Sequence, residues 1–144
     1  MELVADSNIV FSALISGKPV YLDIYRRARV SVPDFMLLEI EKYQARIIKK
    51  TKLAQSFRQF TRELFEEITV IPKLAIAPES FAQAYALCRD IDEKDTPFLA
   101  LSIDLELPLW SNDKTLIEGL SAKGYGRLIG SDEIFAWLES IRDG

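Results

Sequence analysis

The chain has 144 residues, which is the size of one domain with room for a hydrophobic core. With 49% hydrophobic and 28% charged residues, and no apolar run near the ~20 residues of a membrane helix, the composition excludes a disordered chain and a membrane-spanning protein. The net charge of −4 hides an uneven distribution, because seven Lys or Arg and no acid lie between Lys42 and Arg62. We expect this basic segment to be either a docking surface for an anionic partner or a solvated face of a helical hairpin.

The sequence contains no histidine and one cysteine, Cys88. This excludes Ser-His-Asp and Cys-His catalysis and zinc sites built on imidazole or thiolate. Since no disulfide can form within the chain and the N-terminal MELVADSN has no signal-peptide pattern, we expect a cytoplasmic protein. Any metal must be held by oxygen ligands, which favours Mg²⁺ or Mn²⁺.

Short apolar or β-branched runs alternate with helical patterns along the chain. The runs predict strands at 2–5, 30–32, 68–71, 107–110 and 127–130. The patterns between them predict helices at 19–29, 34–50, 53–67, 78–91, 97–106, 113–122 and 132–141. Thr96 is the expected N-cap and Pro97 the expected first residue of the helix at 97–106. Because no tight hairpin turn joins the strands, the sequence predicts an α/β fold with a parallel sheet covered by helices on both faces.

Four acids stand at positions that such a sheet makes informative. Asp6 directly follows the first predicted strand, and Asp113 follows the fourth. Asp95 precedes the helix that begins near Pro97, and Glu39 lies among apolar neighbours within the helix at 34–50. In open parallel sheets, ligands gather at the carboxyl ends of the strands, near the point where the strand order reverses.

Each acid has a simpler explanation when it is taken alone. Asp6 and Asp113 could cap the helices that follow them, Asp95 could lie in the first turn of its helix, and Glu39 could be a surface charge. Taken together, they describe a cluster. Several carboxylates in one cleft repel one another, so their pKa values rise or they recruit a cation. One or two Mg²⁺ ions held this way can support phosphodiester hydrolysis, which makes a nuclease one interpretation.

Three stretches then resemble a known family: VADSNIVFSAL (4–14), VPDFMLLEIEKY (32–43) and DEKDTPFLALSIDLELPLWSNDKTL (92–116). In this order and spacing they resemble a PIN domain, and within that family they are similar to the VapC-type toxin ribonucleases. The resemblance covers roughly residues 2–138. It implies a single PIN-like nuclease domain over 1–144, a three-layer α/β/α sandwich with a central parallel sheet, and Mg²⁺- or Mn²⁺-dependent cleavage of RNA.

The resemblance also assigns roles to residues. The acids that it implies for catalysis and metal binding are Asp6, Glu39, Asp95 and Asp113. Polar side chains that it implies as support for these acids are Ser7, Asn8, Asp92, Ser111 and Asn112. Asp92 could contact a metal through water or cap a turn. Within the basic segment, the residues expected to contact RNA, or to be covered by an antitoxin, are Arg46, Lys49, Lys50 and Lys52.

The resemblance further implies a toxin of a toxin–antitoxin pair that forms homodimers. Phe57, Phe60 and Phe65 could supply the dimer surface or could belong to the core. Three alternatives stay open: a PIN-fold protein that binds RNA or a partner without cleavage, a housekeeping RNA-processing nuclease, and a phosphatase or phosphotransferase with Asp6 as the nucleophile. The last lacks a second aspartate two residues on, because Asn8 stands there.

Overall fold

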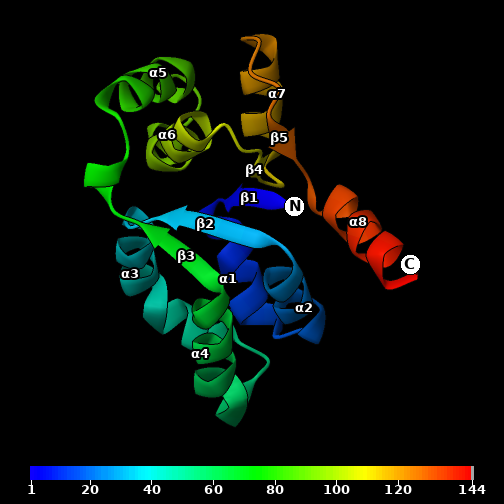
Figure 1. The fold of residues 1–144 in the computed structure, drawn as a ribbon. Helices are drawn as coiled ribbons and strands as arrows, with labels where there is room; N and C mark the ends of the chain where they lie inside the picture. Colours follow the sequence, from blue (N-terminus) through cyan, green and yellow to red (C-terminus); the bar gives the residue numbers. More distant parts are fainter. Residues whose placement is uncertain (144) are drawn as a thin grey trace.

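The computed structural model describes residues 1–143, which contain a five-stranded parallel sheet in the order β3-β2-β1-β4-β5 (Figure 1). The strands are β1 (Glu2–Ala5), β2 (Arg29–Pro33), β3 (Ile68–Ile71), β4 (Leu109–Trp110) and β5 (Leu128–Ile129). Val4 of β1 pairs with Ser31 of β2 on one side and with Leu109 of β4 on the other. The chain therefore adds strands outward from β1 in one direction and then reverses, so that the reversal lies between β1 and β4.

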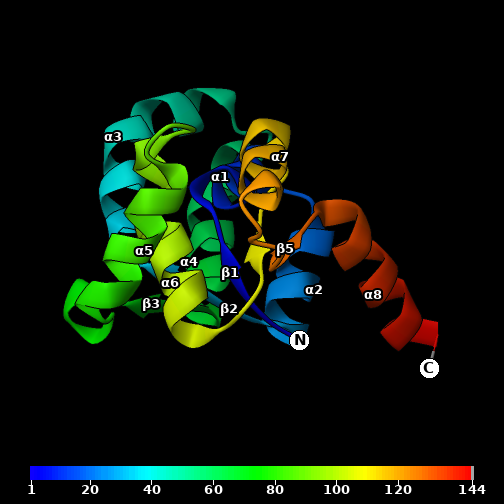
Figure 2. The same cartoon turned by 90° about the horizontal axis from the view of Figure 1, so that it is seen from above.

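Helices cover both faces of this sheet. They are α1 (Ser7–Ser16), α2 (Pro19–Arg27), α3 (Phe35–Lys50), α4 (Phe57–Glu67), α5 (Pro78–Cys88), α6 (Thr96–Leu105), α7 (Lys114–Ala122) and α8 (Ser131–Asp143). Figures 1 and 2 show α1 to α4 on one face and α5, α6 and α7 on the other. At the C-terminal end, α8 is tied to α2 by an ion pair between Arg142 and Asp23. Among residues 1–143, no helix has the length and apolar character that crossing a membrane requires.

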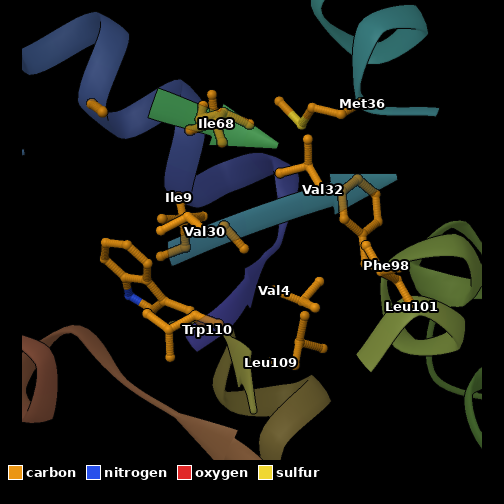
Figure 3. Close-up of a cluster of buried hydrophobic side chains, with 14 of the residues drawn as sticks. Val4, Ile9, Val30, Val32, Met36, Ile68, Phe98, Leu101, Leu109 and Trp110 are labelled. Carbon is orange, nitrogen blue, oxygen red and sulfur yellow. The ribbon is translucent and has the colours of Figure 1, made fainter. Parts of the chain in front are cut away.

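The hydrophobic core lies on both sides of the sheet (Figure 3). Ile9 of α1 and Met36 of α3 contribute from one helical layer, and Phe98 and Leu101 of α6 contribute from the other. Val32 of β2 is fully buried between these layers. Burial of such a side chain stabilises the fold by about 1.5–3 kcal/mol. The predicted α/β fold with a central parallel sheet is confirmed.

Two details differ from the sequence expectations. Helix α6 begins at Thr96 with Asp95 as its N-cap residue, one position earlier than expected. The Thr96 hydroxyl donates a hydrogen bond back to the Glu93 carbonyl at 2.6 Å, so it closes the preceding turn instead of capping α6. The predicted helix at 53–67 is divided into a 3₁₀ turn, Ala54–Ser56, and α4.

Helix α1 was not among the predicted helices. Its buried side chains, Ile9, Val10, Ala13 and Leu14, face the core, and the small polar residues Asn8 and Ser12 are exposed. The contrast between these two faces is weak because the polar residues are small and uncharged, so the segment lacks the strong amphipathic period that identifies a surface helix. Gly17 ends the helix in the left-handed conformation at φ 62°. A side chain there would also collide with Leu53, because a Cβ would lie 2.3 Å from its side-chain atoms.

The phenylalanines of α4 belong to the core rather than to an exposed surface. Phe60 is 6% exposed, and Phe57 and Phe65 pack against the buried cluster. Of the two roles considered for these rings, the structure therefore favours the core over a dimer surface.

Candidate functional site

Asp6 and Asp113 lie at the carboxyl ends of β1 and β4, on the two sides of the reversal in strand order. Each also caps the helix that follows. Asp6 Oδ1 accepts a hydrogen bond from the Ile9 amide at 3.0 Å, and Asp113 Oδ1 accepts one from the Leu116 amide at 3.2 Å. Since each cap uses one carboxylate oxygen, the other oxygen has no capping role. Capping and clustering are thus compatible at both positions.

Ser111 connects these two acids. Its side chain is buried, and its Oγ accepts a hydrogen bond from the Asp113 backbone amide at 3.1 Å. Its hydroxyl is also a hydrogen-bond partner of the Asp6 carboxylate. Burial raises the pKa of Asp6, and the nearby Asp113 carboxylate raises it further, whereas the hydrogen bonds from Ser111 and the Ile9 amide oppose the rise.

Asp95 is the acid whose protonation the site changes most. Its side chain is half-buried and makes no capping hydrogen bond at the start of α6. Burial raises its pKa to about 7, with further contributions from the charges of Asp92, Asp6, Asp113 and Glu39. The effect of four other carboxylates on one group means that all five acids share the same region. The sequence places these residues up to 107 positions apart, and the fold brings them together.

A cavity of about 450 Å³ opens beside this cluster, between α1, α3 and the loop before α6. Its lining residues are Ser7, Asn8, Phe11, Ser12, Ile15, Glu39, Tyr43, Arg46, Ile47, Lys50, Asp92, Lys94 and Asp95. Asp92 also caps the 3₁₀ turn Glu93–Asp95, where its Oδ1 accepts a hydrogen bond from the Lys94 amide at 3.1 Å. The cavity therefore joins acids to basic side chains: Arg46 and Lys50 come from α3, and Lys94 stands between Asp92 and Asp95 in the loop before α6.

The structure separates the basic residues that the sequence treats alike. Arg46 and Lys50 line the cavity, whereas Lys49 and Lys52 are exposed and do not line it. Helical spacing explains the difference, because positions 39, 43, 46 and 50 fall on one face of α3 and position 49 does not. The same spacing from Glu39 could have identified Tyr43 as a site residue. Lys94 was missed as well, although it directly precedes Asp95.

The Asn112 side chain makes its hydrogen bonds with the start of α8. We expected it to support the acids, but its side chain is bonded at both ends to Ser131. Its Oδ1 accepts a hydrogen bond from the Ser131 amide at 2.9 Å, and its Nδ2 donates one to Ser131 Oγ at 2.7 Å. Asn112 therefore fixes the start of α8 to the end of β4. The small polar residue at this position serves the backbone around the site and not the carboxylates themselves.

The side chains can be compared with the needs of a divalent cation. Within residues 1–143, no group of three or more Asp, Glu or Cys side chains converges closely enough to hold a metal ion as the side chains stand. Mg²⁺, however, takes only one or two carboxylates directly and fills its remaining positions with water and substrate oxygens. The donor set is made entirely of oxygen, and burial together with the charges of the neighbouring acids raises the pKa of Asp95. The residues present therefore fit a hard divalent cation.

Comparisons with known proteins agree with this geometry. No similar sequence was found among curated proteins. The crystal structure of PAE2754 from Pyrobaculum aerophilum superimposes with a TM-score of 0.66 over 97% of this chain and 90% of that chain, at 11% sequence identity, and shows the same fold. The sequence pattern of the PIN domain, a family of proteins that are typically nucleases and generally metal-dependent, matches residues 4–130. Because that match covers most of the chain and includes all four acids, the protein belongs to the PIN-domain family.

Proposed function

We propose that this protein is a metal-dependent endoribonuclease that hydrolyses RNA phosphodiester bonds at the cluster of Asp6, Glu39, Asp95 and Asp113. The observation that supports the proposal best is geometric: Asp6 and Asp113 follow the adjacent strands β1 and β4, and Asp95 and Glu39 line the cavity beside them. Burial, and after it the charges of the neighbouring acids, raises the pKa of Asp95 to about 7. A structural cap has no use for such repulsion, which weakens the fold. In a site that binds a cation such repulsion is expected, because the cation relieves it on binding.

Each group of residues has a distinct part in this proposal. Asp6, Asp95 and Asp113, with Glu39, would hold Mg²⁺ or Mn²⁺, and Asp92 would contact the cation through water. When bound, the cation supplies activation of water and stabilisation of the attacking and leaving oxygens. In the cation-free protein, burial and the neighbouring carboxylates raise the pKa of Asp95 to about 7, so the group takes up a proton below that pH. Ser111 positions Asp6 and Asp113 through hydrogen bonds.

The basic side chains of the cavity would bind the phosphates of the substrate. Arg46, Lys50 and Lys94 line the same cavity as Glu39 and Asp95. Phosphate contacts of this kind orient a nucleic acid and account for much of its affinity, but they carry out no chemistry. Lys49 and Lys52 lie outside the cavity and would contribute only through their long-range charge.

The choice of RNA and the biological role depend on the motifs that resemble VapC-type toxins. On that ground we propose that the protein is the toxin of a toxin–antitoxin pair, that an antitoxin covers the basic side of the cavity, and that the protein forms homodimers. A housekeeping role in RNA processing is the competing proposal. Expression in a bacterial host, alone and together with the product of the adjacent reading frame, separates the two, because only a toxin arrests growth and is rescued by its neighbour.

A PIN-fold protein that binds RNA without cleaving it is the alternative at the level of chemistry. Incubation of a mixed single-stranded RNA pool with the protein and Mg²⁺ or Mn²⁺ should yield new 5′ and 3′ ends. Chelation of the cation should stop the reaction. Retention of RNA without cleavage, across both metals, would favour the binding protein.

Single substitutions locate the activity in the proposed cluster. Asp6→Asn keeps the capping oxygen that accepts from Ile9 and removes only the charge, so the fold should survive. We expect it to lower the cleavage rate at least ~100-fold, because metal-site electrostatics supply several kcal/mol to such a reaction. Asp113→Asn should also lower the rate. Glu139→Gln, an exposed charge change on α8, is the matched control and should leave the rate unchanged. Parental activity in Asp6→Asn, with a native circular dichroism spectrum, would refute the assignment of this cluster.

A further inference from the structure

The cavity has an ordered wall that the proposed function does not yet explain. Along α3 it is lined by Glu39, Tyr43, Arg46 and Lys50, which follow one another on a single face of the helix. At a rise of 1.5 Å per residue, Tyr43 lies about 6 Å beyond Glu39 along the helix axis, and Lys50 lies about 16 Å beyond it. The order is therefore acid, aromatic ring and then two basic side chains.

Phe11 of α1 extends the aromatic part of this wall. Helix α1 packs against α3, and Phe11 of α1 meets Tyr43 of α3 edge to face, with 5.7 Å between the ring centroids and 70° between the ring planes. Both rings are half-buried, and both line the cavity. The Lys42 ammonium lies 5.3 Å from the centroid of the Tyr43 ring. Along α3, the Tyr43 ring of this pair thus lies between Glu39 and the basic side chains of Arg46 and Lys50.

This arrangement matches the chemistry of a single nucleic-acid strand. Phosphates need the cations, a scissile phosphate needs the acids with their metal, and an unpaired base needs an apolar or aromatic surface on which to stack. A duplex does not offer such a base, because its bases are already stacked on one another. An aromatic pair between acids and cations in one groove would therefore favour single-stranded over double-stranded nucleic acid, although both carry charged phosphates.

We propose that Phe11 and Tyr43 form a nucleobase-stacking subsite, which holds one unpaired base next to the scissile phosphate while Arg46 and Lys50 bind the phosphates that follow. The inference rests on the proposed function, since it takes RNA as the ligand of the cavity. It deepens that function by assigning the residues that hold an unpaired base.

The test is a binding experiment without divalent cation, so that it does not depend on cleavage. Fluorescence anisotropy in EDTA compares a labelled octamer of uridylate with a labelled chain of eight abasic ribose phosphates, which has the same charge. Base stacking on an aromatic side chain corresponds to roughly 5- to 100-fold in affinity, so the parental protein should prefer the octamer by a factor in that range.

The variants assign that preference to the aromatic pair. Tyr43→Leu and Phe11→Leu should each bind the two chains with nearly equal affinity, whereas Tyr43→Phe should keep most of the preference. Tyr85→Leu is the matched control, because Tyr85 is an aromatic residue on α5 that is 48% exposed and does not line the cavity. It should bind like the parent. Thermal melting confirms that each variant is folded.

Failure of this inference is distinct from failure of the proposed function. A parental protein that binds both chains equally would overturn the stacking subsite without any variant, and so would a Tyr43→Leu protein that keeps the full preference. If the parent also cleaves RNA in Mg²⁺, the nuclease proposal stands in both cases. Preference for the octamer that depends on Tyr43, without cleavage in any metal, would support the subsite and refute the nuclease.

Discussion

The repulsion at Asp95 leads to a prediction about stability that is independent of catalysis. Asp95→Asn removes one charge from the cluster and keeps the size of the side chain. In the absence of divalent cation we expect the variant to be more stable than the parent at pH 8, and to show no such advantage near pH 4. The reason is that the parental carboxylate must ionise in a partly buried position, and beside other carboxylates, as the pH rises.

The sign and size of the effect come from the pKa. Folded Asp95 has a pKa of about 7, against 3.8 for an ordinary aspartate. Between these values the folded protein keeps a proton that the unfolded chain has lost, so the free energy of unfolding falls as the pH rises from about 4 to about 7. A gap of about three pH units, at ~1.4 kcal/mol each, sets an upper bound of ~4 kcal/mol. Because the carboxylate is only half-buried and water screens its neighbours, we expect about 1–2 kcal/mol.

The assay is urea unfolding followed by circular dichroism in EDTA at pH 4.5 and pH 8, with thermal melting as a second readout. At pH 8 the variant should melt roughly 3–6 °C above the parent. Glu139→Gln on α8 controls for the loss of one negative charge at an exposed position. Millimolar Mg²⁺ should shrink the difference, since it relieves the repulsion in the parent. An Asp95→Asn protein that is no more stable than the parent at pH 8 would refute the clustered-charge argument.

Three further outcomes follow from the site. Mg²⁺ or Mn²⁺ at ten times its dissociation constant should raise the free energy of unfolding of the parent by about 1.4 kcal/mol, and a melting curve that does not move at millimolar metal contradicts cation binding. Replacement of Arg46 and Lys50 by glutamine should weaken binding of single-stranded RNA and reduce the magnitude of the slope of log K against log salt by about 1.4. The same change at Lys49 and Lys52 should have a clearly smaller effect. Equal slopes in salt titrations of the two variants would argue against the cavity as the site of phosphate binding. Ser111→Ala should lower the free energy of unfolding, measured in urea, by about 1–2 kcal/mol, because it leaves the Asp113 amide without its buried acceptor. A loss well below about 0.5 kcal/mol would show that this hydrogen bond is dispensable.

Local patterns in the sequence were sufficient for most of the architecture. The predicted segments coincide with strands β1 and β3 and with helices α3, α5 and α7. A short stretch of sequence is enough to identify each of them, because burial on one face imposes a period on the side chains. The absence of histidine limited the metal chemistry to oxygen ligands. The positions of Asp6 and Asp113 after two strands placed both carboxylates at one edge of a parallel sheet, since parallel strands end on the same side.

The tertiary structure decided the features that depend on several elements at once. Helix α1 mixes apolar residues with small uncharged polar ones, so its amphipathic period in the sequence is weak, yet it forms part of the wall of the cavity. Asn112 precedes a site acid in the chain, but its amide is held by Ser131, which lies 19 residues further on. The aromatic contact between Phe11 and Tyr43 exists only because α1 and α3 pack together. Such contacts are set by the distance between elements in space, which a pattern of neighbouring residues does not contain.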